Sequence, residues 1–259
     1  MRLKRWWIPA VVCLLALALA VGGWFAVREL RARQTVVTCG PFELNNTELA
    51  YYYWSEFFYY SGAYGDYLAD AVDFSRPLSE QAYDEDNTWE DYLLQQTLLT
   101  VRDTLSMAAR AEAEGYEMDE SYLSTYRETL VHFASAAQEG GYDDLDGYLR
   151  ASYGPYACRE SFESYLYRSH LAASYADFLL AQCLPTDEAC RAYFESRQAY
   201  YEECGADPDE EDTWLELVRQ DLQSEQYQNA FLTITRQYEV RVDRDAVRLT
   251  PPRGLYERE

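Results

Sequence analysis

The stretch NNTELAYYYWSEFFYY, residues 45–60, opens with a helix-starting signal and ends with eight aromatic side chains in ten positions. Asn45, followed three residues later by Glu48, has the form of a capping box, in which each side chain bonds the backbone N–H of the other residue. The aromatic residues that follow are therefore predicted to lie on a helix.

A helix cannot place all of these aromatic side chains on one face. One side of the helix collects enough apolar residues for a core face: Leu49, Ala50, Tyr53, Trp54, Phe57 and Tyr60. Tyr51, Phe58 and Tyr59 fall on the opposite side. Two interpretations remain open: other elements cover both faces of a fully buried helix, or the second face is an exposed aromatic platform for an apolar partner.

The composition favours a mainly helical protein. The chain has 259 residues, of which 48% are hydrophobic and 16% aromatic, enough for one large domain or two small ones. Leucine, alanine, glutamate and arginine recur at spacings of three and four, and alternating β-branched runs are rare. After the aromatic helix, the pattern predicts helices at residues 89–114, 119–138, 144–152, 159–184, 186–203 and 213–237.

Two short segments near the ends of the chain look like strands. TVVTCG, residues 35–40, is β-branched and is followed by proline, and YEVRV, residues 238–242, alternates in polarity. We expect the second segment to pair with residues 36–39. The predicted fold is mainly α: a helical domain with a small two-stranded pairing of its N- and C-terminal segments, plus one N-terminal transmembrane helix.

Residues 6–27 form an uncharged run that follows Arg2, Lys4 and Arg5. As a helix this run would span roughly 33 Å, enough to cross a bilayer, which predicts an uncleaved signal anchor. A cleaved signal peptide is the alternative, because small residues at 16–20 could be cut. The expected division is a cytoplasmic tail at 1–5, the anchor at 6–27, a linker at 28–34, an extracytoplasmic helical domain at 35–248 and a tail at 249–259.

The charge argues against nucleic acid as a partner. The net charge is −23, and 16 basic residues face 44 acidic residues after residue 33. A surface this acidic repels a phosphate backbone.

No recognisable catalytic or metal motif stands out. The chain lacks a nucleophile elbow, a P-loop and a dinucleotide fingerprint. His132 and His170 lie far apart, and the five cysteines outside the apolar run form no CxxC pair. The stretch DDLDG, residues 143–147, fails as a calcium loop because Tyr142 and Tyr153 fall where carboxylates are needed. We therefore expect no metal, no cofactor and no enzymatic activity.

Several motifs occur in an order that is similar to a known family. They are VVTCG and NNTEL within residues 36–49, AEAEGYEMDE at 111–120, YLRASYG at 148–154 and PTDEACRAYF at 185–194. Placed after an export segment, this order resembles the N-terminal chaperone region of SurA and PrsA type extracytoplasmic foldases. The resemblance covers roughly residues 35–245.

The resemblance implies a helical cradle that binds unfolded or partly folded exported polypeptides without ATP. Many members also carry a parvulin prolyl isomerase domain, which would follow the helix that starts near Thr186. Only residues 205–212 occupy that place, too few for such a domain. The function predicted is therefore that of a non-catalytic, membrane-anchored chaperone.

The aromatic residues are the predicted client-binding site. The candidates are Tyr51, Tyr52, Phe58, Tyr59, Tyr64 and Tyr67. Tyrosine suits this role because its ring offers contact area while its hydroxyl tolerates water. Two alternatives remain: an envelope adaptor that binds one folded partner, and a prolyl isomerase with residual activity.

Overall fold

The computed structural model describes residues 29–256. Its helices are α2 (Asn46–Tyr64), η1 (Leu78–Glu80), α3 (Trp89–Glu114), α4 (Glu120–Glu139), α5 (Leu145–Tyr153), α6 (Arg159–Gln182), α7 (Asp187–Ser196), α8 (Gln198–Glu203) and α9 (Glu211–Gln237). The strands are β1 (Thr35–Cys39), β2 (Phe42–Asn45) and β3 (Val240–Val242). The prediction of a mainly helical fold is confirmed.

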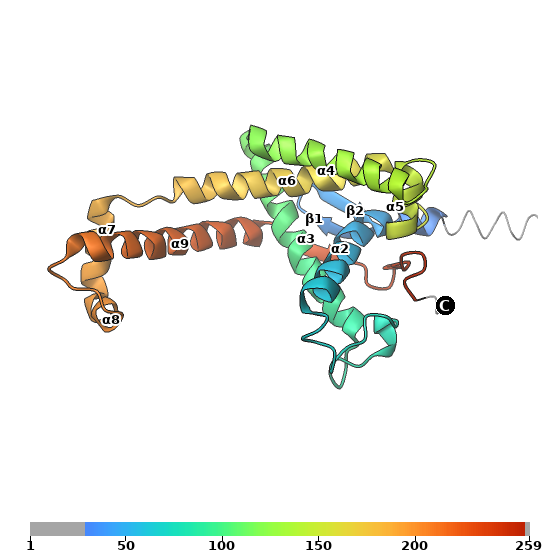
Figure 1. Ribbon diagram of the computed structural model, residues 1–259. Helices are drawn as coiled ribbons and strands as arrows, with labels where there is room; N and C mark the ends of the chain where they lie inside the picture. The colour runs from blue at the N-terminus through green and yellow to red at the C-terminus, as the bar shows by residue number, and fades with distance from the viewer. Residues whose placement is uncertain (1–28, 257–259) are drawn as a thin grey trace, which may run out of the picture.

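The molecule consists of a body and a projecting arm (Figure 1). The body holds the sheet, against which α2, α3 and α6 pack, and α4 and α5 pack in turn on α6 and α2. Helices α6 and α9 run side by side away from the body and lead to α7 and α8 at the tip of the arm. The first described residues and the C-terminal segment both lie at the end opposite this tip.

The sheet joins the two ends of the chain. Its order is β2-β1-β3, and both pairings are antiparallel. Val37 pairs with Val242 and Cys39 with Val240, which confirms the predicted pairing of the terminal segments. The expectation of two strands was wrong, because β2 turns back on β1 through the two-residue turn Gly40-Pro41.

The core of the body has two parts. In one, Val37 and Leu44 of the sheet pack with Leu105 of α3 and Leu171 of α6. The other is largely aromatic and packs the side chains of α2 against α5 and α6. Burial of each large apolar side chain contributes roughly 1.5–3 kcal/mol, so these two clusters supply most of the stabilisation of the body.

The tip of the arm has a small core of its own. The rings of Phe194 and Trp214 stack with centroids 3.9 Å apart, and Tyr201 packs on Phe194 at 5.7 Å. The single helix predicted at 186–203 was wrong: the chain breaks at Arg197, where φ is −131°. This break allows Tyr201 on α8 to turn back onto α7, which a continuous helix would prevent.

Two segments that were expected to be irregular are structured. Residues 29–33, within the predicted linker, are helical. The backbone N–H of Arg253 donates to the carbonyl of Ala151 at 2.7 Å, and Leu249 packs against the core. The C-terminal segment up to residue 256 is therefore attached to the body.

Within residues 29–256, none of the helices combines the length and the apolarity needed to cross a bilayer. The predicted anchor at residues 6–27 lies outside the described residues.

The substitution Gly40→Ala should destabilise the body more than a comparable change elsewhere. Gly40 has φ +57°, and an added Cβ would lie 2.4 Å from the Tyr238 ring. The matched control is Gly115→Ala, because Gly115 has φ +65° with open space around it. Both variants carry the left-handed backbone cost of about 1–2 kcal/mol. In urea unfolding, the loss for Gly40→Ala should exceed the control by about 1 kcal/mol or more; equal losses would contradict the close approach of Tyr238.

Candidate functional site

The aromatic helix α2 starts at the capping box that the sequence predicts. The Asn45 Oδ1 accepts hydrogen bonds from the backbone N–H groups of Thr47 at 2.9 Å and Glu48 at 3.0 Å. Glu48 Oε2 accepts in return from the Asn45 N–H at 3.0 Å. These bonds fix the first turn of the helix and therefore the direction of every side chain that follows.

Tyr51 and Tyr52, two of the six predicted site residues, are buried. The Tyr51 ring packs edge-on against Tyr153 of α5 and Phe162 of α6, at 5.1 and 5.3 Å. Tyr52 meets the ring of Tyr165 on α6 at 4.7 Å. Their assignment to an exposed client site was wrong, because α5 and α6 cover that face of the helix.

The Tyr51 hydroxyl holds these helices together. It donates to the carbonyl of Cys158 at 3.3 Å, accepts from the Cys158 N–H at 3.2 Å and lies 2.8 Å from Ser161 Oγ. Desolvation raises the pKa of Tyr51 to about 12, despite the hydrogen bonds that act in the opposite direction. The residue is therefore a neutral structural link between α2 and the start of α6.

The other four predicted residues are exposed. The exposed fractions are 44% for Phe58, 57% for Tyr59, 41% for Tyr64 and 87% for Tyr67. They lie at the C-terminal end of α2 and just beyond it, where α5 and α6 no longer cover the helix. The platform interpretation therefore describes only this end of the aromatic stretch.

The exposed tyrosines form part of a longer chain of ring contacts, which we call the tyrosine ladder. Its ring centroids follow one another in the order Tyr59, Tyr64, Tyr60, Tyr92 and Tyr83. The four successive distances between centroids are 5.8, 5.7, 6.4 and 4.4 Å. No ring contact joins Phe58 or Tyr67 to this ladder among the described residues. The predicted site is thus divided into the ladder and two separate exposed rings.

Three ladder members were not among the predicted site residues. Tyr60 was assigned to the core face, and Tyr92 lies on the helix that starts at Trp89. Tyr83 lies in a loop, and no local sequence signal shows where its ring would go. The loop brings it to Tyr92 because the Gln81 side chain bonds both backbone groups of Asp73, each at 2.8 Å.

The surroundings of the ladder are strongly negative. Residues 64–91 contain nine acidic residues and a single base, Arg76. Hydrogen bonds from the backbone N–H of Asp86 and from Asn87 lower the pKa of Asp84, which keeps this carboxylate charged. An aromatic surface with this charge attracts cationic and apolar ligands and repels anionic ones.

A second apolar surface lies in the corner between the body and the arm. A cavity of about 490 Å³ lies between α3, α6 and α9 and is lined by Phe178, Leu179 and Ile234. At its edge Glu114 binds both Arg110 and the Tyr175 hydroxyl, each at 2.5 Å. The charge at this edge is balanced, so the corner is apolar without the acidic character of the ladder.

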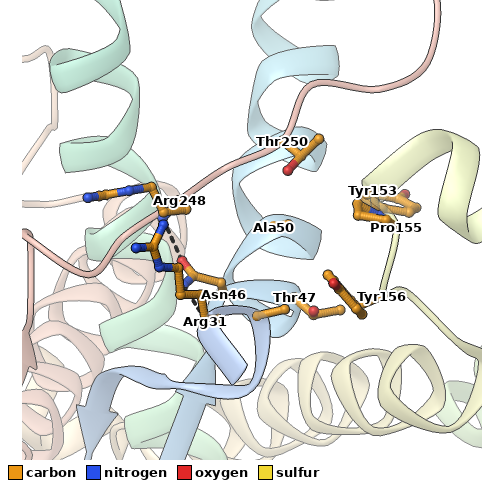
Figure 2. Close-up of a pocket in the computed structure, with 11 residues that line it drawn as sticks. Arg31, Asn46, Thr47, Ala50, Tyr153, Pro155, Tyr156, Arg248 and Thr250 are labelled. Carbon is orange, nitrogen blue, oxygen red and sulfur yellow. Dashed lines mark hydrogen bonds between the residues drawn. The ribbon is translucent and has the colours of Figure 1, made fainter. Parts of the chain in front are cut away.

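A second cavity, of about 210 Å³, lies beside the first turn of α2 (Figure 2). Asn46 stands at its wall, Tyr153 and Tyr156 lie opposite, and the C-terminal segment crosses it at Arg248 and Thr250. The polar backbone and side-chain groups around this cavity mainly hydrogen-bond one another. The cavity therefore lies at the junction between the N-terminal and C-terminal segments of the described chain, which we call the seam.

Across residues 29–256 no group of three or more His, Cys, Asp or Glu residues could hold a metal ion. The five described cysteines are free. His170 Nδ1 lies 2.8 Å from the carbonyl of Leu166 in its own helix, a structural contact.

Comparison with known proteins found no matching protein family, no matching curated protein and no matching solved structure. The similarity to SurA and PrsA type foldases therefore stays a prediction from the order of the motifs.

Replacing Tyr51 with phenylalanine should change stability in a pH-dependent way. At pH 8 the variant should be about 1 kcal/mol less stable, because buried hydrogen bonds are lost. Above pH 10 the parent loses stability, since the tyrosine ionises in the unfolded chain before it does in the folded one. The deficit of the variant should therefore fall to about zero near pH 11.

Urea unfolding at both pH values, followed by tryptophan fluorescence, tests this expectation. Tyr167→Phe is the control, because Tyr167 is an exposed tyrosine on the same helix as Ser161. A deficit that stays the same at pH 8 and pH 11 would contradict the burial of Tyr51.

Proposed function

We propose that this protein is a membrane-anchored, extracytoplasmic chaperone that binds unfolded or partly folded exported polypeptides without catalysing a reaction on them. The observation that carries this proposal is the tyrosine ladder: a chain of stacked and edge-on rings whose outer members, Tyr59, Tyr64 and Tyr83, are exposed. Exposed ring surface of this extent does not stabilise the core of the domain, and exposed apolar patches of this kind commonly mark binding sites.

The chemistry of the ladder suits loose binding of many sequences. Aromatic contacts are worth about 0.5–1.5 kcal/mol each and need no fixed hydrogen-bond pattern, so different apolar side chains can use the same rings. The hydroxyls keep the surface wettable when it is empty. Such contacts release a bound segment readily, as a chaperone that works without ATP requires.

The charge of the domain supports the same function. With 44 acidic and 16 basic residues after residue 33, copies of the domain repel one another. A polypeptide held on the ladder therefore gains a strongly charged neighbour, which opposes aggregation. Basic segments of the client are attracted to the same surface.

The alternatives make different predictions. An envelope adaptor would bind one folded partner to saturation and ignore unfolded chains. A prolyl isomerase would accelerate the isomerisation of proline peptides, although only residues 204–210 connect α8 to α9, where the catalytic domain of the similar family would lie.

The test uses the full chain in phosphatidylcholine nanodiscs and follows light scattering by a chemically unfolded exported protein. The parent should suppress aggregation, and the double variant Tyr59→Ser/Tyr64→Ser should need roughly tenfold more protein for the same effect, because two ring contacts are lost. Tyr200→Ser is the matched control, since Tyr200 on α8 and Tyr59 are both 57% exposed.

The control should behave like the parent. An equal loss in the control, or no suppression by the parent at excess protein, would contradict the ladder as the client site, and the second result would favour the adaptor.

A further inference from the structure

A small cavity opens beside the first rung of the tyrosine ladder. Its volume is about 290 Å³, and it lies where α2, α3 and α6 meet. The lining residues are Tyr52, Ser55, Glu56, Tyr59, Thr100 and Tyr165. We call it the Glu56 pocket. It combines three aromatic rings with one carboxylate, and Tyr59 belongs to both the pocket and the ladder.

The carboxylate of Glu56 is held in position but its charge is not balanced. Thr100 Oγ1 donates to Glu56 Oε1 at 2.6 Å, which fixes the carboxylate between α2 and α3. No arginine among the described residues forms an ion pair with it. The arginines of residues 29–256 that form ion pairs all bind other carboxylates, so no ion pair neutralises Glu56.

Tyr52 lines the inner wall of the pocket. It is 3% exposed, and its hydroxyl oxygen is enclosed in the interior and not open to the pocket. The Tyr165 hydroxyl donates to Ser55 Oγ at 3.3 Å. The carboxylate of Glu56 is therefore the polar group through which the pocket would attract a charged ligand.

Arg168 of α6 does not pair with Glu56 either. Arg168 lies 3.7 Å from Glu48 and over the ring of Phe42, at 4.9 Å from its centroid. Its charge is therefore balanced by Glu48, about two turns before Glu56 on α2. The field at Glu56 stays negative.

We propose that the Glu56 pocket takes the cationic end of a lysine or arginine side chain of the bound polypeptide. This inference rests on the proposed function and names the side chain that the ladder accepts best. The aromatic walls attract the cation, and Glu56 supplies the opposite charge. The apolar stem of the same side chain lies along Tyr59, where the ladder begins.

The test compares two fluorescein-labelled apolar peptides that differ at one position, which is lysine in one and acetyl-lysine in the other. Acetylation removes the charge and keeps the stem. Fluorescence anisotropy with the full chain in phosphatidylcholine nanodiscs gives both dissociation constants. The parent should bind the lysine peptide about tenfold more tightly.

The variant Glu56→Gln should lose most of this preference while it binds the acetyl-lysine peptide as the parent does, because glutamine keeps the bond to Thr100. Glu195→Gln, an exposed change on α7 in the arm, is the control and should keep the tenfold preference.

Two results would overturn the inference. If the parent binds both peptides equally, or if Glu56→Gln keeps the full preference, the pocket is not a cation site, although the chaperone proposal stands. If neither peptide binds the parent, both the pocket and the chaperone proposal fail.

Discussion

One buried amide holds the two ends of this chain together. The Asn46 side chain donates from Nδ2 to the carbonyls of Arg31 and Ala246, both at 3.0 Å, and its Oδ1 accepts from the Arg248 N–H at 2.7 Å (Figure 2). It is 4% exposed, so these bonds form away from water, where an unpaired amide would be costly. Asn46 is also the first residue of α2. The position of the aromatic helix thus depends on the closure of the ends, and β3 beside β1 continues the same seam.

The sequence predicted what local chemistry decides. The capping box, the helix at residues 89–114 and the pairing of the terminal segments carry their own signals, and each lies where it was expected. The faces of α2 could not be predicted, because a helix that is apolar all round gives no period to show which side is covered. Tyr51 and Tyr52 were misplaced for this reason. The ladder was not predicted because it needs Tyr83, whose place depends on a loop fold in which the nearby Gln81 side chain bonds the backbone of Asp73, eight residues earlier.

The proposed binding surface lies where α2 leaves the cover of α5 and α6. Up to Phe57 its aromatic residues stabilise the core, and from Phe58 onwards they are exposed apart from the half-buried Tyr60. In the proposed function, the same helix contributes to folding at its start and to client binding at its end. The acidic loop after it would add a preference for positively charged clients that rings alone do not have, and the Glu56 pocket would place that preference at one site. The corner groove beside the arm is apolar but neutral, which leaves the ladder as the surface with both properties.

Limited trypsin digestion of the full chain, with and without the substitution Asn46→Ala, tests the closure of the ends most directly. If the Asn46 amide holds the C-terminal segment, the parent should resist cleavage after Arg244 and Arg248, whose backbones the seam protects. The variant should be cut there at least tenfold faster, since removing three buried hydrogen bonds costs on the order of 3 kcal/mol. Equal cleavage rates in the two proteins would show that the segment is held by other contacts, and the account of Asn46 as the central link would be wrong.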